Sequence, residues 1–303
     1  MLTSNDRLII KILKISCFVL FFGRAWQFLF WDAPLRALLW DQELLEGLIT
    51  TVFDINWEEY VTSSTVDLLI QGVIKATGVF YLLMAIFSLF IKDQIKIGKH
   101  LLMIASASFA FLAFLYCKEK FFHIGQFFEY SIQILTPTLL LIAIYYPAEL
   151  AKNRFQLSIK IAIALTFICH GLYAYGFYPR PGVFIDMTIG SLKISENSAH
   201  ELMYVAGILD FIAAAGIFLK RNSLIFITYC VVWGTVTALA RTWGNLNFDS
   251  NQLAIIHQYL PQTLYRLPHG LIPLVLLIIH YPRLFSAKGK FENLVSEKAK
   301  TIS

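Results

Sequence analysis

Long uninterrupted runs of apolar residues constrain this chain more than any other feature of its sequence. Each run holds about 20 residues, roughly the length of helix that crosses the ~30 Å hydrocarbon layer of a membrane. The composition agrees, because 57% of the 303 residues are hydrophobic, only 15% are charged and the mean hydropathy is +0.64. These values exclude an ordinary soluble enzyme. The chain is therefore predicted to be an all-α membrane protein.

Eight apolar stretches, each bounded by charged residues or proline, are long enough to be transmembrane helices. We expect them at residues 8–31, 67–91, 99–116, 125–146, 158–178, 200–219, 223–240 and 259–281. The first follows capping residues at 3–6 and contains no small-residue cleavage site, so it is predicted to be an anchor and not a signal peptide. The loop at 32–66 carries an amphipathic pattern that predicts an interfacial helix on the outer leaflet.

The placement of lysine and arginine predicts the orientation of the spans. Sixteen of the 25 basic residues lie on the side of the N-terminus and six lie on the other side, while Arg24, Lys75 and Arg266 are intramembrane. Because basic residues concentrate in cytoplasmic loops, both termini are predicted to be cytoplasmic, in a cell membrane of the bacterial inner-membrane type. Residues 284–303 would form a cytoplasmic tail that contacts anionic lipid. The net charge of +5 therefore predicts no nucleic-acid partner.

The two halves of the chain resemble each other at an offset of about 135 residues. Four positions of the fourth span recur in the eighth at an offset of 136: Gln126, Tyr130, Gln133 and Pro137 correspond to Gln262, Arg266, His269 and Pro273. Capping boxes at Ser64–Asp67 and Ser198–Glu201 are expected to begin the second and sixth spans. We therefore predict two tandem four-helix repeats, residues 1–147 and 148–283, related by a pseudo-twofold axis along the membrane normal. The alternative is chance resemblance between apolar helices.

Polar side chains within the predicted spans are the candidate site residues. An ionisable group in the hydrocarbon costs roughly 2.5–3.5 kcal/mol, so it normally faces a partner or a watery cavity. Helical spacing places the polar residues of the fourth span on one face, and those of the eighth span likewise. We expect an outward-open polar cavity between the repeats, lined by Arg24, Lys75, Gln126, Glu129, Gln133, His170, Asp210, Arg241, Gln262, Arg266 and His269.

The charges of this cavity are expected to pair, and all of its polar residues to lie in the outer half of the membrane. Glu129 is predicted to lie opposite Lys75 or Arg266. Asp210 is predicted to lie opposite Arg266 or Arg241. The alternative is that these groups form only internal ion pairs and hydrogen bonds that fix the packing of the helices.

Other chemistry finds little support in the sequence. Nucleotide-binding, serine-hydrolase and zinc-protease motifs are absent, and the four cysteines have no metal-binding spacing. Haem ligation by His170 and His269 would need His123 or His257, which look like loop or helix-start residues, so haem is not favoured. Most aromatic residues at the outer ends of the spans are expected to form an interfacial belt. Some of them would suit a flat apolar ligand such as a quinone.

The segment Gly171-Leu-Tyr-Ala-Tyr-Gly176, followed by Pro179-Arg-Pro181, Glu201 and Asp210, resembles the DoxX-like small membrane proteins. These are four-helix modules with an acidic residue near the start of the second helix. The resemblance covers residues 158–281 and extends less clearly to 8–146. It implies a quinone-facing or partner-docking role, because relatives include membrane subunits linked to quinone-dependent oxidation of sulfur compounds and to redox homeostasis.

Glu201 and Asp210 are the positions that this resemblance carries over. The chain differs from the family in being a fused pair and in having Lys75 near the position that Asp210 occupies in the second copy. The leading hypothesis is a membrane component of a redox system that binds a quinone-like or small anionic ligand, with a redox-protein subunit as a partner in addition to the lipid bilayer.

Two other functions stay open at this point. A small-solute transporter or channel is less favoured, because the inner halves of the predicted spans are almost purely apolar. A non-catalytic scaffold would dock an extracytoplasmic partner on the acidic loop at 32–66.

Overall fold

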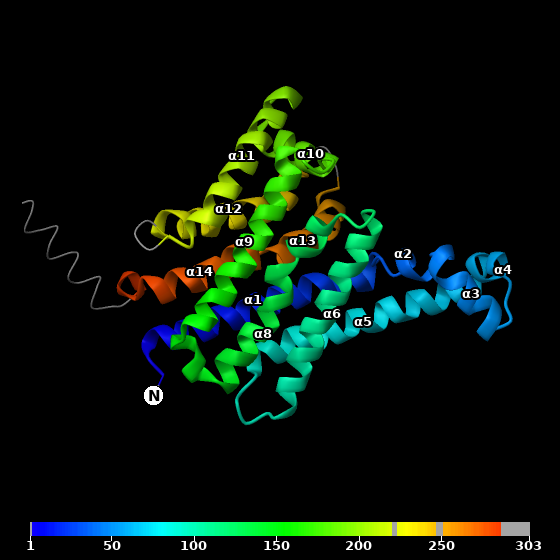
Figure 1. Cartoon of the computed structure of the whole chain (residues 1–303), viewed down its shortest axis with the longest axis horizontal. Helices are drawn as coiled ribbons and strands as arrows, with labels where there is room; N and C mark the ends of the chain where they lie inside the picture. Colours follow the sequence, from blue (N-terminus) through cyan, green and yellow to red (C-terminus); the bar gives the residue numbers. More distant parts are fainter. Residues whose placement is uncertain (1, 220–222, 247–250, 286–303) are drawn as a thin grey trace, which may run out of the picture.

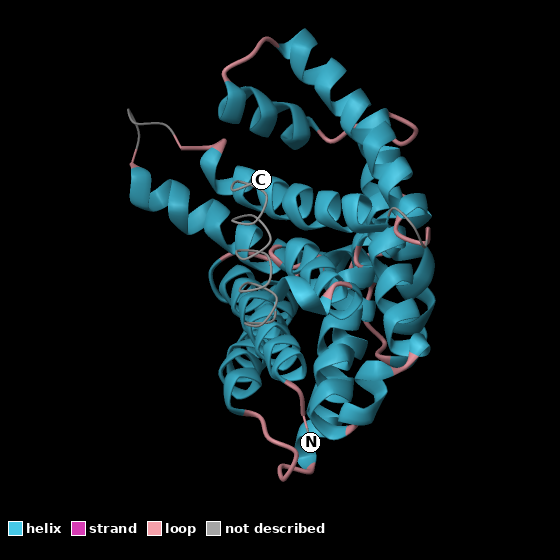
Figure 2. Ribbon diagram, turned by 90° about the vertical axis from the view of Figure 1, so that its left-hand side faces the viewer, coloured by secondary structure: helices cyan, strands magenta, loops and turns pink. Residues whose placement is uncertain are grey.

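The structure is a computed structural model that describes residues 2–219, 223–246 and 251–285. Every regular element in these ranges is a helix, and the long helices form a single bundle (Figure 1, Figure 2). This confirms the all-α prediction. Residues 286–303, which make up most of the predicted cytoplasmic tail, lie outside the described residues.

Ten helices make up the body of the bundle. In chain order they are α1 (Ser4–Phe30), α5 (Ser64–Phe90), α6 (Ile97–Glu119), α7 (Ile124–Glu129), α8 (Ser131–Tyr145), α9 (Asn153–Tyr175), α11 (Glu196–Gly216), α12 (Ser223–Trp243), α13 (Gln252–Arg266) and α14 (Pro268–His280). Shorter helices connect them: α2 (Arg36–Leu39), α3 (Gln42–Val52), α4 (Trp57–Thr62), α10 (Gly182–Leu192) and the 3₁₀ turns η1 (Pro147–Ala151) and η2 (Pro282–Phe285).

Seven segments of the described chain are long and apolar enough to cross a membrane, with α7–α8 and α13–α14 each counted as one. The 27-residue helix α1 is not among these seven. The chain is therefore a multi-pass membrane protein, and the count of eight spans stays a prediction.

The predicted fourth and eighth spans are each found as one apolar segment, Ile124–Tyr145 and Gln252–His280, although each is divided into two consecutive helices. α7 gives way to α8 at Tyr130, and α13 gives way to α14 at Leu267. Pro268 opens α14, where proline is tolerated because the first turn of a helix leaves its N–H groups unpaired. Leu267 keeps right-handed helical backbone angles, so α14 continues directly from α13.

Two helices begin earlier than the sequence predicts. The hydroxyl of Ser63, and not that of Ser64, caps α5 by accepting a hydrogen bond from the N–H of Val66. Similarly Ser195, and not Ser198, caps α11. Each capping serine has extended backbone angles, which let its oxygen reach the free N–H groups of the first turn. The predicted capping boxes at Ser64 and Ser198 are therefore wrong in register.

Helix α1 lies antiparallel to the α13–α14 segment. At one end, Asn5 donates a hydrogen bond of 3.3 Å to the carbonyl of Pro282, just beyond α14. At the other end, the indole N–H of Trp31 donates one of 3.2 Å to the carbonyl of His257 in α13. Because α1 also contacts α5 and α8, it is enclosed by both halves of the chain (Figure 1).

The two halves pair their helices in the same way. In the first half α1 packs along α5 and α6 packs along α8, while in the second half α9 packs along α11 and α12 packs along α14. The halves meet where α1 contacts α13 and α14, and where α9 contacts α7 and α8. The helices at this junction are the ones that carry most of the buried polar side chains.

Small residues allow α9 and α11 to approach closely. A Cβ atom added to Gly207 would lie 2.8 Å from the backbone nitrogen of Tyr175 and 2.9 Å from the carbonyl oxygen of Gly171. Both neighbours are backbone atoms of a helix and cannot move independently. Close backbone approach at small residues is a common basis of helix association in membranes.

The connection between α1 and α5 contains three short helices in the region where an interfacial helix is predicted. Asp41 caps α3 and also forms an ion pair with Lys118 at the end of α6. One stripe of α3 exposes Leu44, Leu48 and Val52. The helix itself is therefore confirmed, while its position on a membrane surface stays a prediction.

We expect Gly207→Ala to destabilise the protein, because the added methyl group forces α9 and α11 apart. Overpacking of this kind typically costs about 1–3 kcal/mol. The matched control is Gly72→Ala in α5, where an added Cβ atom has no neighbour within 4 Å. Thermal unfolding in detergent should show a lower Tm for G207A and an unchanged or slightly higher Tm for G72A. Equal Tm values for the two variants would contradict the close approach.

We also expect acid to release α3 from α6. The hydrogen bond from Lys118, followed by that from the Leu44 N–H, holds the pKa of Asp41 below its ordinary value. Because the pKa of the carboxyl is lower in the folded than in the unfolded protein, its ionised form stabilises the folded segment at pH values above the unfolded pKa, near pH 4. This stabilisation is lost as the pH falls through the folded pKa. An environment-sensitive fluorophore on L44C should report a transition below about pH 4. The same transition in an Asp41→Asn background would contradict this origin.

Candidate ligand-binding cavity

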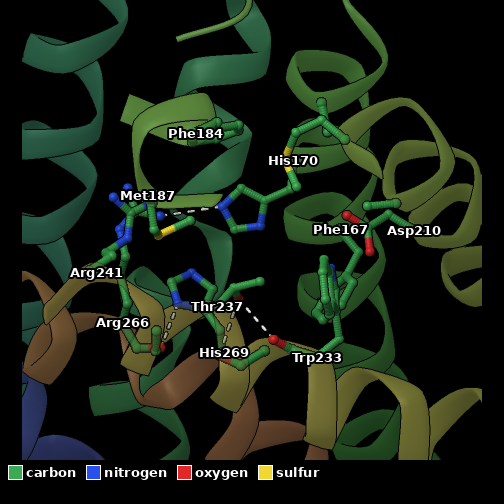
Figure 3. A pocket seen from close by; sticks show the side chains of 15 residues that line it. Phe167, His170, Phe184, Met187, Asp210, Trp233, Thr237, Arg241, Arg266 and His269 are labelled. Carbon is green, nitrogen blue, oxygen red and sulfur yellow. Dashed lines mark hydrogen bonds between the residues drawn. The ribbon is translucent and has the colours of Figure 1, made fainter. Parts of the chain in front are cut away.

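A cavity lies within the second half of the bundle, enclosed by α9, α10, α11, α12, α13 and α14 (Figure 3). The empty space counted within it, about 620 Å³, includes solvent at its open mouth. Its walls are mainly apolar and include Phe167, Phe184, Met187, Met203, Ala206 and Trp233. Its polar lining comes from His170, Asp210, Arg241, Arg266 and His269, together with Thr237.

This cavity lies within the second half and not between the halves, so a polar cavity between the halves stays a prediction. At the junction between the halves, α1 and α13 touch through their backbones. A Cβ atom on Gly23 would lie 2.7 Å from the nitrogen of Tyr265 and 2.8 Å from the carbonyl oxygen of Pro261. At this point of the junction the two backbones are in direct contact. The open volume lies instead on the far side of α9, where α10 covers the gap between α11 and α12.

Glu129 and Arg266 form an ion pair across the junction. The guanidinium Nη1 of Arg266 donates a 3.0 Å hydrogen bond to Oε1 of Glu129, whose side chain is only 7% exposed. The amide of Gln126 donates to Oε2 of the same carboxylate at 3.0 Å. Of the two cations predicted to face Glu129, Arg266 is therefore the one that pairs with it. Lys75 is exposed on α5 and lines no part of the cavity.

His170 connects this ion pair to the cavity. Its Nε2 lies 3.0 Å from Oε1 of Glu129 and 3.3 Å from Nη1 of Arg266. Nε2 donates to the carboxylate when it carries a hydrogen, and it accepts from the guanidinium when it does not. A proton on this nitrogen therefore changes which of the two partners His170 holds. His170 lines the cavity (Figure 3), whereas Glu129 is not part of its lining.

Arg24 forms a second polar cluster at the junction, and it has no carboxylate partner among the described residues. Its guanidinium is completely buried and donates to the side-chain carbonyls of Gln27 and Gln133, both at 2.8 Å. It also lies over the ring of Tyr265, 3.7 Å from the centroid, with the rings of Tyr116 and Tyr130 at 5.7 and 5.3 Å. Tyrosine rings stabilise a cation through their electron-rich faces.

The polar stripe predicted on the fourth span is therefore divided between the two clusters. Gln126 and Glu129, on α7, face Arg266, whereas Gln133, on α8, binds Arg24. The helix break at Tyr130 separates the two groups. On the eighth span, Arg266 and His269 line the cavity while the half-buried Gln262 does not.

Arg241 and His269 are buried in the cavity wall with polar atoms that lack partners. Arg241 is 8% exposed, its Nε has no hydrogen-bond partner, and no described carboxylate lies within ion-pair distance of it. Nδ1 of His269 lies 2.7 Å from the carbonyl oxygen of Arg266, so this nitrogen carries a hydrogen. Nε2 of His269 is then left without a partner at 3% exposure. Buried polar groups normally have partners, and exceptions call for an explanation.

Asp210 forms no ion pair with an arginine among the described residues. It receives a 2.9 Å hydrogen bond from the hydroxyl of Tyr229, a residue six positions from the start of α12. Asp210 itself is six residues from the end of α11, so it is nearer to the opposite side of the bundle from Arg241. The prediction of an Asp210–arginine pair is therefore wrong, because the described partner of Asp210 is Tyr229, while its position in the outer half of the membrane stays a prediction.

Several residues of the site escaped sequence analysis. The three tyrosines around Arg24 come from α6, α13 and the α7–α8 break, and tyrosine in an apolar run gave no sign of this role. The cavity wall formed by Phe184 and Met187 belongs to α10, in the connection between the predicted fifth and sixth spans, where no helix is predicted. Helical spacing of apolar residues at 182–192 was the available signal.

The ligand-binding roles of the predicted site residues stay predictions. No protein-family model matches the chain, and neither a curated protein nor a solved structure is significantly similar to it. The site must therefore be interpreted from its own geometry.

We expect Glu129→Gln to destabilise the protein strongly, because it leaves Arg266 buried without a counter-charge. Breaking a buried ion pair by removing one partner typically costs about 3–5 kcal/mol. The control is Glu119→Gln at the exposed end of α6. Thermal unfolding should show a large fall in Tm for E129Q, little change for E119Q, and partial recovery in the double variant E129Q/R266Q. A double variant no more stable than E129Q would contradict the pairing.

Proposed function

We propose that the protein is a membrane component of a quinone-linked redox system and that its cavity binds a quinone-like or small anionic ligand. One observation carries this proposal: the cationic and imidazole groups of Arg241, Arg266, His170 and His269 line a cavity whose walls are otherwise mainly apolar and aromatic, with Asp210 on the opposite wall. Sites for small molecules typically combine apolar walls with a few polar groups that orient the ligand. A quinone ring with its carbonyl oxygens, or an anionic head on an apolar body, matches this arrangement.

The polarity of the cavity changes along α12. Arg241 is two residues from the end of the helix, and Trp233 is eight residues, or about 12 Å, further in. The polar part of a bound molecule would therefore lie near the membrane surface, and its apolar part would point towards the membrane centre. Amphipathic molecules already have this orientation in one leaflet of a bilayer, so such a molecule would not have to turn over to enter the cavity.

We also propose that the chain has eight spans, with α1 as the first, in two four-helix repeats at 1–147 and 148–283. The matching helix pairs of the two halves support this arrangement, as do the helix breaks at Tyr130 and Leu267. Both halves insert short helices after their first long helix. The capping residues found in the structure, Ser63 and Ser195, do not share the offset of the other repeated positions. They therefore do not support the repeat.

The distribution of basic residues supports cytoplasmic termini and a bacterial-type inner membrane. Membership in the DoxX-like family is a proposal that rests on the second half of the chain. Of the two positions that this resemblance carries over, Asp210 lines the cavity, whereas Glu201 is exposed on α11. Asp210 is therefore the better candidate for a shared role, and a redox-protein subunit remains the proposed partner.

A small-solute transporter is a second candidate, favoured by the depth of Asp210. A transported solute must meet polar groups beyond the outer half of the membrane. The carboxyl of Asp210 with the hydroxyl of Tyr229 supplies such groups. Uptake of radiolabelled solutes into proteoliposomes would detect this activity.

Titration with a short-chain quinone tests the leading proposal. The protein is placed in lipid nanodiscs, and quenching of the cavity residue Trp233 is followed against a Trp233→Phe background, because the chain has six tryptophans. We expect saturable quenching that Ala206→Leu weakens at least tenfold by filling the cavity. The matched control is Ala76→Leu on the exposed face of α5, which should bind normally. Quenching that is non-saturable, or equal in both variants, would contradict binding in the cavity.

A further inference from the structure

Arg241 is a buried cation without a partner in the described part of the molecule. It is more than nine-tenths buried, its side chain lines the cavity, and its Nε makes no hydrogen bond. Burying an unpaired charge costs several kcal/mol, so such a group normally has a counter-ion. The position of Arg241 therefore calls for an anion in the cavity.

Neither carboxylate near the cavity supplies that anion. Glu129 is already engaged by Arg266, Gln126 and His170. Asp210 lies on the opposite wall, where it is bound by Tyr229 (Figure 3). Among the described residues of the cavity, Arg241 therefore has no counter-ion.

Two further groups beside Arg241 are available to the same head group. Nε of Arg266 is buried without a partner, although Nη1 of this residue holds Glu129. Nε2 of His269 is also free, and in the neutral ring it accepts a hydrogen bond. An oxygen-rich head group with a negative charge could satisfy both arginines. A hydroxyl on the same head group, as in a singly protonated phosphate, would suit His269.

We propose that the cavity ligand is an amphipathic anion, with a carboxylate or phosphate head group bound by Arg241 and an apolar tail among Phe167, Met203 and Trp233. This inference rests on the proposed function of the cavity as a ligand site and selects the anionic head group over the neutral quinone ring. Arginine suits the role because its planar guanidinium matches two oxygens of a carboxylate or phosphate. The tail occupies the apolar stretch of about 12 Å along α12.

Matched probes that differ only in the head group test this inference. They are a bromine-terminated fatty acid, the corresponding alkyl phosphate and the corresponding bromo-alcohol, titrated into the protein in nanodiscs of neutral lipid. Bromine quenches Trp233 when the tail enters the cavity. We expect at least one of the two anionic probes to bind tenfold or more tightly than the alcohol, and the stronger of the two identifies the head group. Inorganic phosphate, which has no tail, should not compete at millimolar concentration.

Variants of Arg241 separate ligand binding from a structural role. Arg241→Gln should remove the preference for the anion, and Arg241→Lys should retain most of it. Arg36→Gln is the control, because Arg36 is an outer arginine that is already paired with Asp32 and Asp67. Without ligand, R241Q should have a higher Tm than the wild-type protein, since an uncompensated buried charge has been removed. A lower Tm would mean that the guanidinium has a partner in the free protein and would overturn the inference.

The possible outcomes distinguish this inference from the proposed function. If the alcohol binds saturably and as tightly as both anions, the cavity is a ligand site without selectivity for an anion, and only the inference fails. If none of the probes binds and the short-chain quinone also fails, the cavity is not a ligand site and both proposals fail. Should R241Q not fold, the comparison of probes on the wild-type protein still decides the question.

Discussion

The ion pair between Glu129 and Arg266 is the interaction on which the arrangement of the two halves depends. Each residue sits at a helix break, α7 ending at Glu129 and α13 ending at Arg266. Neither charge can be left unpaired in an apolar interior, where water does not compensate for the loss of a partner. Pairing across the junction therefore holds the last helical segment of each half against the other, and α9 brings His170 to the same carboxylate.

A second constraint comes from the burial of Arg24 without a carboxylate. Its charge is met by two amide oxygens and by the face of Tyr265, which requires α1 and α13 to lie very close together. Gly23 permits that approach, because any larger residue would meet the backbone of α13. The two halves are consequently in direct backbone contact at this point, and the described cavity lies in the second half, where α10 bridges α11 and α12.

The sequence predicts the individual members of the site better than their grouping. Polar residues in apolar runs are conspicuous, so His170, Asp210, Arg241, Arg266 and His269 are all found in advance, and all line the cavity. Helical periodicity also places Glu129 and Arg266 on facing stripes. The same periodicity fails for Gln133, which binds Arg24 and not the Glu129 cluster. The end of α7 before Tyr130 could not be predicted, because neither glycine nor proline occurs there in the sequence. The predicted role of Lys75 in the cavity fails for another reason, because its side chain is exposed on α5.

By itself, the sequence determined that this is a helical multi-pass membrane protein and which side chains are costly to bury. These properties depend on composition and local periodicity, which any stretch of about 20 residues carries within itself. Only the tertiary structure decided which costly side chains meet, that Asp210 pairs with Tyr229 and not with an arginine, and that Arg241 has no described partner. Those outcomes depend on helix breaks, on backbone approach at glycines and on short connecting helices. Such contacts join residues that are distant in the chain, so no local pattern encodes them.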